Sequence, residues 1–248
     1  MSARPAPQLS ETVLRPVRGH HAFESCVEQL GTAIRLGVYP RGSTLPPERE
    51  LAPLLDVSRA TLREAMAALR EAGLVQTTRG RGGGTVVTLR PRSPSGRAAS
   101  RISAARRRSW HEALTFRRIV EPGAAALAAQ RAADGDLTAE LRDQLETAHA
   151  DVAAAARAAH HRQADSRFHL TLASVTESPR VVQAITSVQA ELHEMLLAIP
   201  VLDANITHSD GQHAAVVRAV LAGRPDRAFT AMEQHCDDTA ALLRGLVG

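Results

Sequence analysis

The spacing of hydrophobic residues predicts helices along most of the chain. Between residues 23 and 36, one helical stripe carries Phe23, Val27, Leu30 and Ile34. Between residues 59 and 69, the spacing i, i+3, i+4 and i+7 puts Leu62, Ala65, Met66 and Leu69 on one face. Both patterns are typical of amphipathic helices that bury one face against neighbouring elements.

The second half of the chain is predicted to be entirely helical. From Ser109 onward no segment alternates between apolar and polar residues as a strand does. Helix-breaking clusters interrupt the pattern near residues 133–135, 177–179, 200–205 and 223–225. These breaks indicate about six helices between residues 109 and 247, which would form a compact all-α bundle.

Before that bundle, the pattern predicts two short helices followed by a β-hairpin. Pro47 is suited to the start of the first helix, and Ser58 is suited to the N-cap of the second. Ala72-Gly73 should end the second helix. Residues 74–78 and 85–89 then predict two strands, joined by a positively charged tip of Arg and Gly. With the helix over residues 23–36, we expect three helices and a hairpin wing.

Polar residues on the helix that begins at Arg59 indicate DNA binding. Arg59 and Arg63 lie one turn apart, off the apolar face, with Thr61 between them. A recognition helix presents its N-terminal residues to base edges and phosphates in the major groove. The planar guanidinium of Arg can bond guanine O6 and N7 together. The alternative is that both arginines are solvated helix charges and nothing more.

A resemblance to a known family covers this region. The segments PERELA (residues 47–52) and VSRATLREAMAALREAGLV (residues 57–75), with the glycine-rich wing, resemble the winged helix-turn-helix of GntR-family bacterial transcription regulators. The resemblance implies contacts with a double-stranded DNA operator by Arg49, Arg59, Thr61, Arg63, Arg79 and Gly80.

Two residues depart from the family pattern. Pro53 falls inside the first helix, where the loss of one hydrogen bond should bend or shorten the helix at a cost of about 3 kcal/mol. Asp56 stands where the family usually has a turn glycine, and Asp tolerates the left-handed conformation better than most residues. Neither departure removes a residue that the resemblance places on DNA.

The length of 248 residues suggests two domains, and charge is divided unequally between them. Residues 1–108 contain 18 Arg and 8 acidic residues, whereas residues 109–248 contain 12 Arg and 18 acidic residues. DNA is therefore expected to bind the N-terminal half only. We expect a disordered tail over residues 1–19, a winged helix-turn-helix domain over 20–90, a basic linker over 91–108 and an all-α bundle over 109–248.

The composition argues against membrane and secreted proteins. No apolar run approaches 18 residues, so no membrane span is expected. The first 19 residues lack the apolar core of a signal peptide. Cys26 and Cys236 fall in different predicted domains and suggest no disulfide framework, which fits a reducing cytoplasm.

Nine of the eleven histidines lie in the predicted bundle, and three of them are candidate metal ligands. Asp165 and His169 are four residues apart and share one helix face. His213 and His235 each lie near the apolar stripe of a separate helix. Three imidazoles and one carboxylate suit Zn²⁺, Ni²⁺ or a similar divalent ion.

Alternatives remain open for these residues. The three histidines could be hydrogen-bonded core residues with no metal. Asp238 lies one turn from His235 and could substitute for one ligand. The sequence places five other histidines on the surface or at the rim of a pocket: His149, His160, His161, His193 and His208.

A second resemblance covers the bundle. It rests on an Arg-x-x-x-Glu-Pro element (Arg117, Glu121, Pro122), the Asp-x-x-x-His pair and the two later histidines. These motifs resemble those of the FCD effector domain in the FadR subfamily of GntR regulators. The resemblance implies a metal bound by Asp165, His169, His213 and His235. It also implies that Arg117 reaches into the same cavity toward an anionic effector, usually a small carboxylic acid. Alternatively, Arg117 only pairs with Glu121 along its helix.

Together these patterns predict a ligand-responsive transcription regulator and not an enzyme. A homodimer is expected, because paired recognition helices must meet the two half-sites of a short inverted-repeat operator. The protein would have one arrangement that can bind DNA and one that cannot. A metabolite that binds the two arrangements with unequal affinity would control DNA binding. Two other classes remain: a metal-dependent enzyme domain fused to a DNA-binding module, and a DNA-binding protein with an inert dimerisation bundle.

Overall fold

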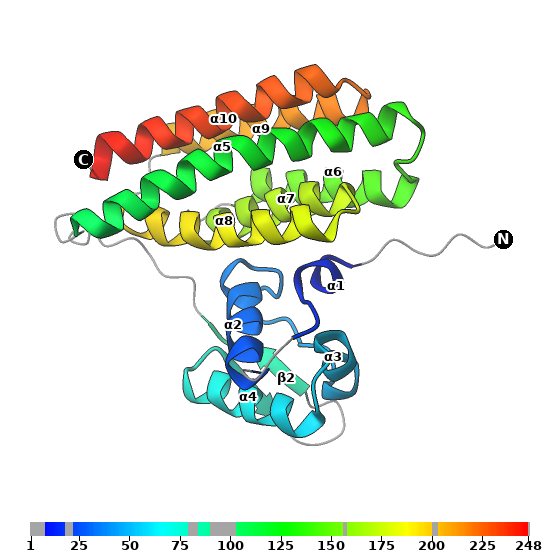
Figure 1. Cartoon of the computed structure of the whole chain (residues 1–248), viewed down its shortest axis with the longest axis vertical. Coiled ribbons are helices and arrows are strands. Elements are labelled where there is room, and N and C mark those ends of the chain that lie inside the picture. Colours follow the sequence, from blue (N-terminus) through cyan, green and yellow to red (C-terminus); the bar gives the residue numbers. More distant parts are fainter. Residues whose placement is uncertain are drawn as a thin grey trace. The chain divides into compact units, whose positions relative to one another are not determined.

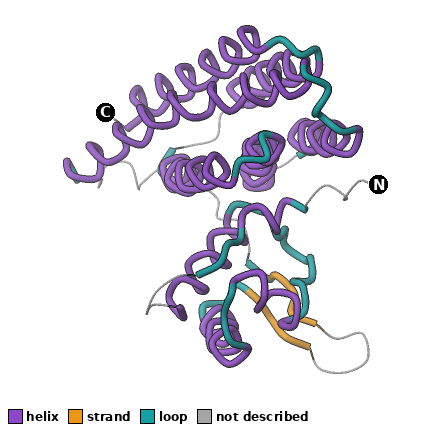
Figure 2. Tube along the Cα trace, turned by 45° about the vertical axis from the view of Figure 1, so that its right-hand side comes forward, coloured by secondary structure: helices purple, strands orange, loops and turns teal. Residues whose placement is uncertain are grey.

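The computed structural model of the protein describes residues 8–17, 22–78, 84–89, 103–155, 158–199 and 203–247. Contacts divide the chain into two compact units, one over residues 7–91 and the other containing residues 92–248. Helices dominate both units, and the sheet found among the described residues is a two-stranded hairpin (Figure 2). No helix in these ranges is long and apolar enough to cross a membrane.

The N-terminal unit combines helices with the hairpin (Figure 1). Its helices are α1 (Leu9–Val13), α2 (Ala22–Arg35), α3 (Glu48–Leu55) and α4 (Arg59–Glu71). Strands β1 (Val75–Thr78) and β2 (Gly84–Val87) are antiparallel, with Val75 opposite Val87. The expected winged helix-turn-helix fold is confirmed, and α1 is an addition to it.

Helix α4 forms as its sequence predicts. Its apolar face is buried and consists of Leu62, Ala65, Met66 and Leu69. The helix contacts α2, α3 and β1. Ser58 Oγ accepts a hydrogen bond from the backbone N–H of Thr61 at 3.0 Å, which satisfies a donor at the start of the helix. Gly73 follows the last turn with a φ of 73°, a conformation that glycine adopts without strain.

Helix α3 accommodates both departures from the family pattern. Pro53 lies inside the helix without breaking it, and the helix ends after eight residues at Leu55. Asp56 then adopts the left-handed conformation, with φ of 53° and ψ of 46°. The tight turn before α4 therefore forms without glycine, as the tolerance of Asp for this conformation predicts.

Two expectations for this unit are wrong. The composition predicts a disordered tail over residues 1–19, but residues 8–17 pack on the unit. Leu14 is buried, and the N–H of Val17 donates to the carbonyl of Leu55 at 2.7 Å, because the unit offers this apolar segment a core to join. On α2, Phe23 is exposed and Cys26 is buried in its place, so the helix turns a slightly different face inward than the apolar stripe predicts.

The second unit is the expected all-α bundle, with six helices in its described residues. They are α5 (Ala104–Ala133), α6 (Ala139–Ala154), α7 (Ala158–Val175), α8 (Pro179–Leu197), α9 (Asp203–Leu221) and α10 (Pro225–Val247). Helix α5 contacts α7, α8, α9 and α10, and α10 runs antiparallel beside it (Figure 1). Side chains on α5 can therefore meet side chains from four other helices.

The boundaries of the bundle differ from the prediction at two places. Helix α5 begins at Ala104, so the end of the expected linker over residues 91–108 is helical. Ser103 Oγ caps this helix by accepting from the N–H of Arg106 at 3.2 Å. Helix α6 ends at Ala154 inside an alanine-rich run of high helix propensity. Helices α6 and α7 contact each other on either side of this break.

Candidate DNA-binding helix and metal–effector site

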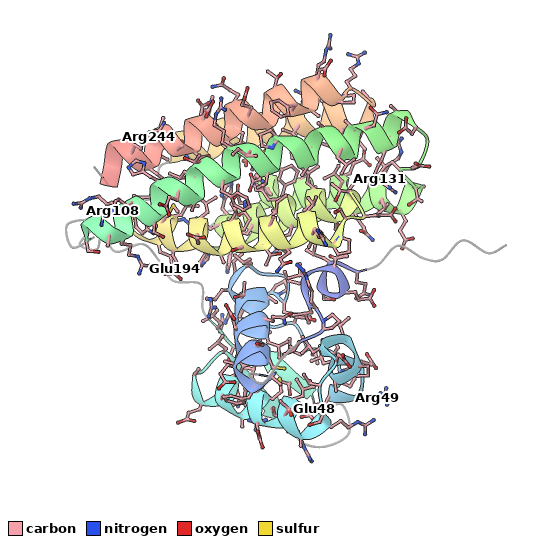
Figure 3. All side chains as sticks on the ribbon, viewed as in Figure 1. Glu48, Arg49, Arg108, Arg131, Glu194 and Arg244 are labelled. Atoms are coloured by element: carbon pink, nitrogen blue, oxygen red, sulfur yellow. The ribbon has the colours of Figure 1, made fainter. Side chains whose placement is uncertain are left out.

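The N-terminal turn of α4 exposes two arginine side chains. Arg59 and Arg63 are both exposed, and neither forms an ion pair within the described part of the chain. Thr61 is half-buried, and its hydroxyl lies 2.9 Å from Ser58 Oγ. Arg49 projects from α3 with 72% of its side chain exposed (Figure 3). The other two predicted DNA contacts, Arg79 and Gly80, lie outside the described residues.

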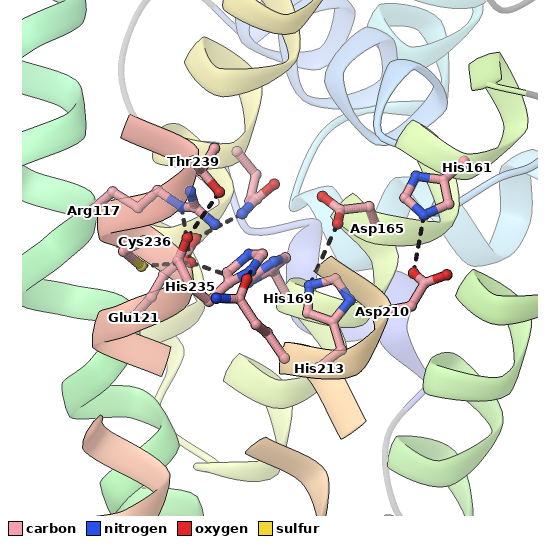
Figure 4. A network of polar contacts seen from close by, with 12 residues as sticks. Arg117, Glu121, His161, Asp165, His169, Asp210, His213, His235, Cys236 and Thr239 are labelled. Atoms are coloured by element: carbon pink, nitrogen blue, oxygen red, sulfur yellow. Dashed lines mark hydrogen bonds and ion pairs between the residues drawn. The ribbon is translucent and has the colours of Figure 1, made fainter. Parts of the chain in front are cut away.

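Three imidazoles meet in the interior of the bundle (Figure 4). His169 on α7, His213 on α9 and His235 on α10 are buried, and each offers a ring nitrogen within 4.8 Å of the others. Asp165 lies one turn before His169, and its Oδ1 is 3.5 Å from His213 Nε2. Three imidazoles from three helices are thus brought together, and Asp165 lies beside His213 without belonging to the group of mutually close ligand atoms.

Most ring nitrogens of this cluster have no hydrogen-bond partner in the described structure. Neither nitrogen of His169 or His213 forms a hydrogen bond, although His169 Nδ1 lies 3.1 Å from Glu121 Oε2. His235 Nδ1 is 3.1 Å from the side-chain oxygen of Gln212. Because buried polar atoms are normally paired, this arrangement disfavours histidines kept only for core packing. It fits a set of nitrogen donors for a metal ion.

The protonation state of the cluster also suits metal binding. Burial lowers the pKa of His213 and His235 well below the ordinary value, and neighbouring imidazoles and the Arg117 charge lower it further. Both rings are therefore neutral at pH 7 and keep a lone pair for a ligand bond. Neutral imidazoles with one carboxylate are a donor set that Zn²⁺ and similar ions accept.

Glu121 on α5 connects the histidine cluster to Arg117. Its carboxylate accepts hydrogen bonds from Arg117 Nε at 3.0 Å and from Gln189 Nε2 at 2.6 Å. Burial acts to raise the pKa of Glu121, but the charge of Arg117 and the contacts with His169 and Gln189 outweigh it and hold the pKa far below the usual range. Glu121 is therefore a buried anion that orients the side chains of both neighbours.

Arg117 is only partly satisfied by that ion pair. Its side chain is 1% exposed, yet Nη1 and Nη2 have no hydrogen-bond partner among the described residues. Arg117, Asp165 and His235 line one cavity of about 70 Å³, which has room for roughly five water molecules. The Arg117–Glu121 pair is present, and it leaves two donors of the guanidinium available for a ligand in this cavity.

Comparison with known proteins identifies the family. A family model for bacterial regulatory proteins of the gntR family matches residues 23–87, and one for the FCD domain matches residues 112–238. The chain is also 33% identical over 239 residues to the HTH-type transcriptional regulator RmpR of Mycobacterium gastri. The aligned region covers 94% of this chain and 84% of the relative. The chain belongs to the GntR family.

Other relatives of this GntR regulator agree. It is 29% identical to the HTH-type transcriptional repressor NanR of Cronobacter sakazakii, over 94% of this chain and 89% of the relative. The solved structure of McbR/YncC from E. coli has a TM-score of 0.50 at 17% identity, over 93% of this chain and 100% of that one, and supports the fold alone. These relatives identify a transcription regulator with an FCD domain, so the metal-enzyme interpretation is rejected.

The bundle of this GntR regulator contains site residues that sequence reasoning missed. Arg162 lines the same cavity as Arg117, and its spacing of three and seven residues from Asp165 and His169 could have indicated a shared helix face. Gln189 and Gln212 contact Glu121 and His235 respectively, and no spacing rule signals either contact.

The positions of His161 and Asp238 differ from those that the sequence predicts. His161 is predicted on the surface or at a pocket rim, but it is buried, lines the cavity and lies 3.1 Å from Asp210 Oδ1. Asp238 is the alternative metal ligand, but it accepts a hydrogen bond from Gln212 Nε2 at 2.7 Å and does not belong to the imidazole cluster. Its position one turn along α10 carries it past the three rings.

Proposed function

We propose that this GntR regulator binds an inverted-repeat operator as a homodimer, in the cytoplasm, under the control of a small carboxylate-type metabolite bound beside a divalent metal ion in the FCD bundle. One observation carries the proposal. The imidazoles of His169, His213 and His235 are buried together, and the ring nitrogens of His169 and His213 have no hydrogen-bond partner among the described residues. The cluster adjoins a cavity lined by Arg117, whose terminal nitrogens are also unpartnered.

Operator binding is assigned to the exposed turn that begins α4. Arg59 and Arg63 would reach base edges or phosphates in the major groove, and Thr61 and Arg49 would add contacts to the backbone. The wing residues Arg79 and Gly80 would touch phosphates beside the minor groove. Arg59 and Arg63 are exposed and form no ion pair among the described residues, so they are available to a phosphate, which supports this assignment. Arg49 has an exposed contact with Glu50 at 3.4 Å.

The metal would be held by Asp165, His169, His213 and His235. Three imidazoles and a carboxylate match Zn²⁺, Ni²⁺ or a similar ion. When bound, such an ion supplies a Lewis acid for one carboxylate oxygen of the effector. Glu121 and Gln212 would hold two of the imidazole rings in orientation.

Arg117 would bind the effector carboxylate through Nη1 and Nη2, the two donors that Glu121 does not occupy. Its helix, α5, is the first element of the bundle and follows the segment that leads from the DNA-binding unit. A ligand that shifts α5 could therefore change how the DNA-binding unit is presented, provided that it binds two arrangements unequally.

An exposed apolar face on α5 supports the homodimer. Phe116, Ile119 and Leu127 share one side of the helix and are 44%, 67% and 41% exposed. Gly123 lies on the same side, and Phe229 of the neighbouring α10 is 37% exposed. A continuous exposed apolar face of this kind is typical of an interaction surface. A second copy is its proposed occupant, since a two-fold axis there duplicates the recognition helix for an inverted repeat.

Operator titrations with the full-length protein test the DNA-binding half of the proposal. A footprint upstream of the protein's own gene would define the operator. Arg59→Ala and Arg63→Ala should each weaken binding by roughly 1–3 kcal/mol, because each removes a base-edge or phosphate contact. Both variants should melt like the wild type. Operator binding by the double variant that equals the wild type would reject α4 as the recognition helix.

A screen of carboxylates by thermal shift tests the sensing half. A matching compound should raise the melting temperature by mass action and change operator affinity by about 1–3 kcal/mol of coupling. Arg117→Ala should lose most of this response and keep its operator affinity without effector. Compounds that stabilise both proteins equally would remove Arg117 from the site. Compounds that bind without changing operator affinity would reject the bundle as the sensor.

A further inference from the structure

A second guanidinium lies in the wall of the effector cavity. Arg162 is on α7, nearly one turn before Asp165 and two turns before His169, so the three side chains share a helix face. Only 7% of Arg162 is exposed, and it lines the cavity together with Arg117. The proposed function uses Arg117 and leaves Arg162 without a role.

The charge of Arg162 is poorly compensated. Nη2 donates one hydrogen bond to the backbone carbonyl of Ile199 at 3.2 Å, and Nη1 is buried without a partner. Arg162 forms no ion pair with a carboxylate of the described residues. Burial lowers the pKa of Arg162 to about 10, and the attraction of Asp165 opposes this only in part. The side chain is still a cation at neutral pH.

The two arginines of the cavity are therefore in different states. Arg117 is neutralised by Glu121 at 3.0 Å, whereas Arg162 has one hydrogen bond to a backbone carbonyl and only a partly compensating attraction to Asp165, with which it forms no ion pair. Leucine side chains of α8, Leu192 and Leu196, line the same cavity and offer no counter-charge. Proteins rarely bury an unpaired cation, because its lost hydration is not repaid. An anionic group on a ligand would supply the missing partner.

We propose that Arg162 forms a second anion subsite and that the effector is a small compound with two anionic groups, such as a dicarboxylate. The inference rests on the proposed function, in which Arg117 and the metal take the first carboxylate. The second carboxylate would accept a hydrogen bond from Arg162 Nη1. A monocarboxylate of the same length would leave the Arg162 guanidinium unpaired in the occupied cavity. It should therefore bind less tightly than the dicarboxylate.

Matched pairs of acids test the subsite in the full-length protein. Calorimetric titrations would compare propionate with malonate, butyrate with succinate, and pentanoate with glutarate. The wild type should bind one dicarboxylate at least about ten-fold more tightly than its matched monocarboxylate, as for a charge-assisted hydrogen bond in a buried site. Arg162→Gln should abolish this preference and keep the metal content unchanged by elemental analysis.

A control variant separates the subsite from a general change in charge. Arg167→Gln makes the same substitution on the same helix, but Arg167 pairs with Asp151 at 3.2 Å and is not part of the cavity wall. This variant should keep the wild-type preference for the dicarboxylate. A loss of preference in Arg167→Gln equal to that in Arg162→Gln would overturn the inference.

The remaining outcomes distinguish the inference from the proposed function. If the wild type binds monocarboxylates as tightly as dicarboxylates, or if Arg162→Gln keeps the preference, the second subsite is rejected and carboxylate sensing stands. If no acid of any chain length binds the wild type, carboxylate sensing itself is rejected, and the subsite with it.

Folding of the variants is checked without ligand. Because Arg162→Leu removes a buried charge that lacks a partner, it should melt at or above the wild-type temperature. A large fall in melting temperature for both Arg162→Leu and Arg162→Gln would mean that the guanidinium is already satisfied in the folded protein. That result would overturn the inference.

Discussion

Glu121 occupies a central position among the buried polar residues, because several buried side chains contact its carboxylate. It accepts from Arg117 and Gln189 and lies 3.1 Å from His169 Nδ1. Its negative charge keeps the Arg117 cation stable in the bundle interior, where an unpaired charge would be costly. Its position also leaves His169 Nε2 directed away from Glu121 and available to a metal.

Substitution of this carboxylate should weaken the metal site without removing a ligand. Glu121→Gln keeps the size of the side chain and removes its charge, so we expect metal affinity to fall by about 10–100-fold. His213→Ala removes a direct ligand and should lose most of the metal. Competition with a chromophoric chelator measures both effects. The exposed Glu146→Gln on α6 is the control, and equal affinities in all four proteins would contradict the assignment of the metal site.

The buried thiol of Cys26 gives a pH-dependent prediction. Burial raises the pKa of Cys26 above its ordinary value near 9. The unfolded chain therefore releases this proton at a lower pH than the native protein does. The stabilisation from Cys26 is complete below about pH 9 and is lost as the pH rises beyond it.

Thiol labelling checks the burial of the cysteines, and denaturant titrations check the pH dependence of stability that Cys26 predicts. In the native protein at pH 8, neither Cys26 nor Cys236 should react with a disulfide reagent, since both are buried. Two thiols should appear on unfolding. Above pH 9 the free energy of unfolding of the wild type should fall more steeply than that of Cys26→Ala. Rapid labelling of the folded protein would contradict the buried positions of these two thiols.

At the scale of elements, the turns between helices decide which faces meet. Gly223 joins α9 to α10 with a φ of 62°, and a Cβ placed there would lie 3.0 Å from the backbone N and Cα of Ala133 at the end of α5. Only glycine permits this approach without displacing a backbone. The turn thereby positions α9 and α10, which carry His213 and His235, against α5.

Replacement of this glycine should destabilise the bundle through two effects. Gly223→Ala adds left-handed strain and a clash with Ala133, and we expect a loss of about 2 kcal/mol or more in the free energy of unfolding. Gly135→Ala is the matched control, because its φ is 81° and nothing lies within 4 Å of the added Cβ. It should cost about 1 kcal/mol from strain alone. Equal losses in urea titrations of the two variants would reject the close contact.

At the scale of the whole molecule, the proposed function assigns DNA reading to one unit and sensing to the other. The N-terminal unit carries exposed arginines on α4, and the bundle has an acidic excess that disfavours contact with phosphate. The apolar face of α5, which includes Phe116, Ile119 and Leu127, is exposed in the part of the chain that the structure describes. A dimer through this face would bury it and bring two DNA-binding units to one operator.

A charge on this face should separate the protomers. Ile119→Asp places a carboxylate at the most exposed of the large apolar residues that the structure describes. We therefore expect dimer dissociation to become at least about ten-fold more favourable. Operator affinity should fall with it, because one protomer meets only one half-site. Light scattering after size-exclusion chromatography measures the mass. Thr147→Asp on α6 is the control. A dimer that persists in both variants would place the interface elsewhere.

Local patterns in the sequence predict much of this protein. The apolar face of α4, its Ser58 cap and the left-handed Asp56 depend on interactions within one or two turns, so spacing and residue type are sufficient to predict them. The i, i+4 spacing of Asp165 and His169 likewise places them on one face of α7. The helix breaks that Gly and Pro mark were predictable for the same reason.

Tertiary structure decided the features that depend on contacts between distant segments. The sequence could not place Glu121 between Arg117, Gln189 and His169, because those contacts depend on how α5, α7 and α8 pack. It also could not indicate that Arg162 is buried without a counter-ion, since local spacing carries no information on partners from other helices. The sequence by itself determined which faces the helices present. Packing determined which side chains share a cavity, because burial and pairing are properties of several helices at once.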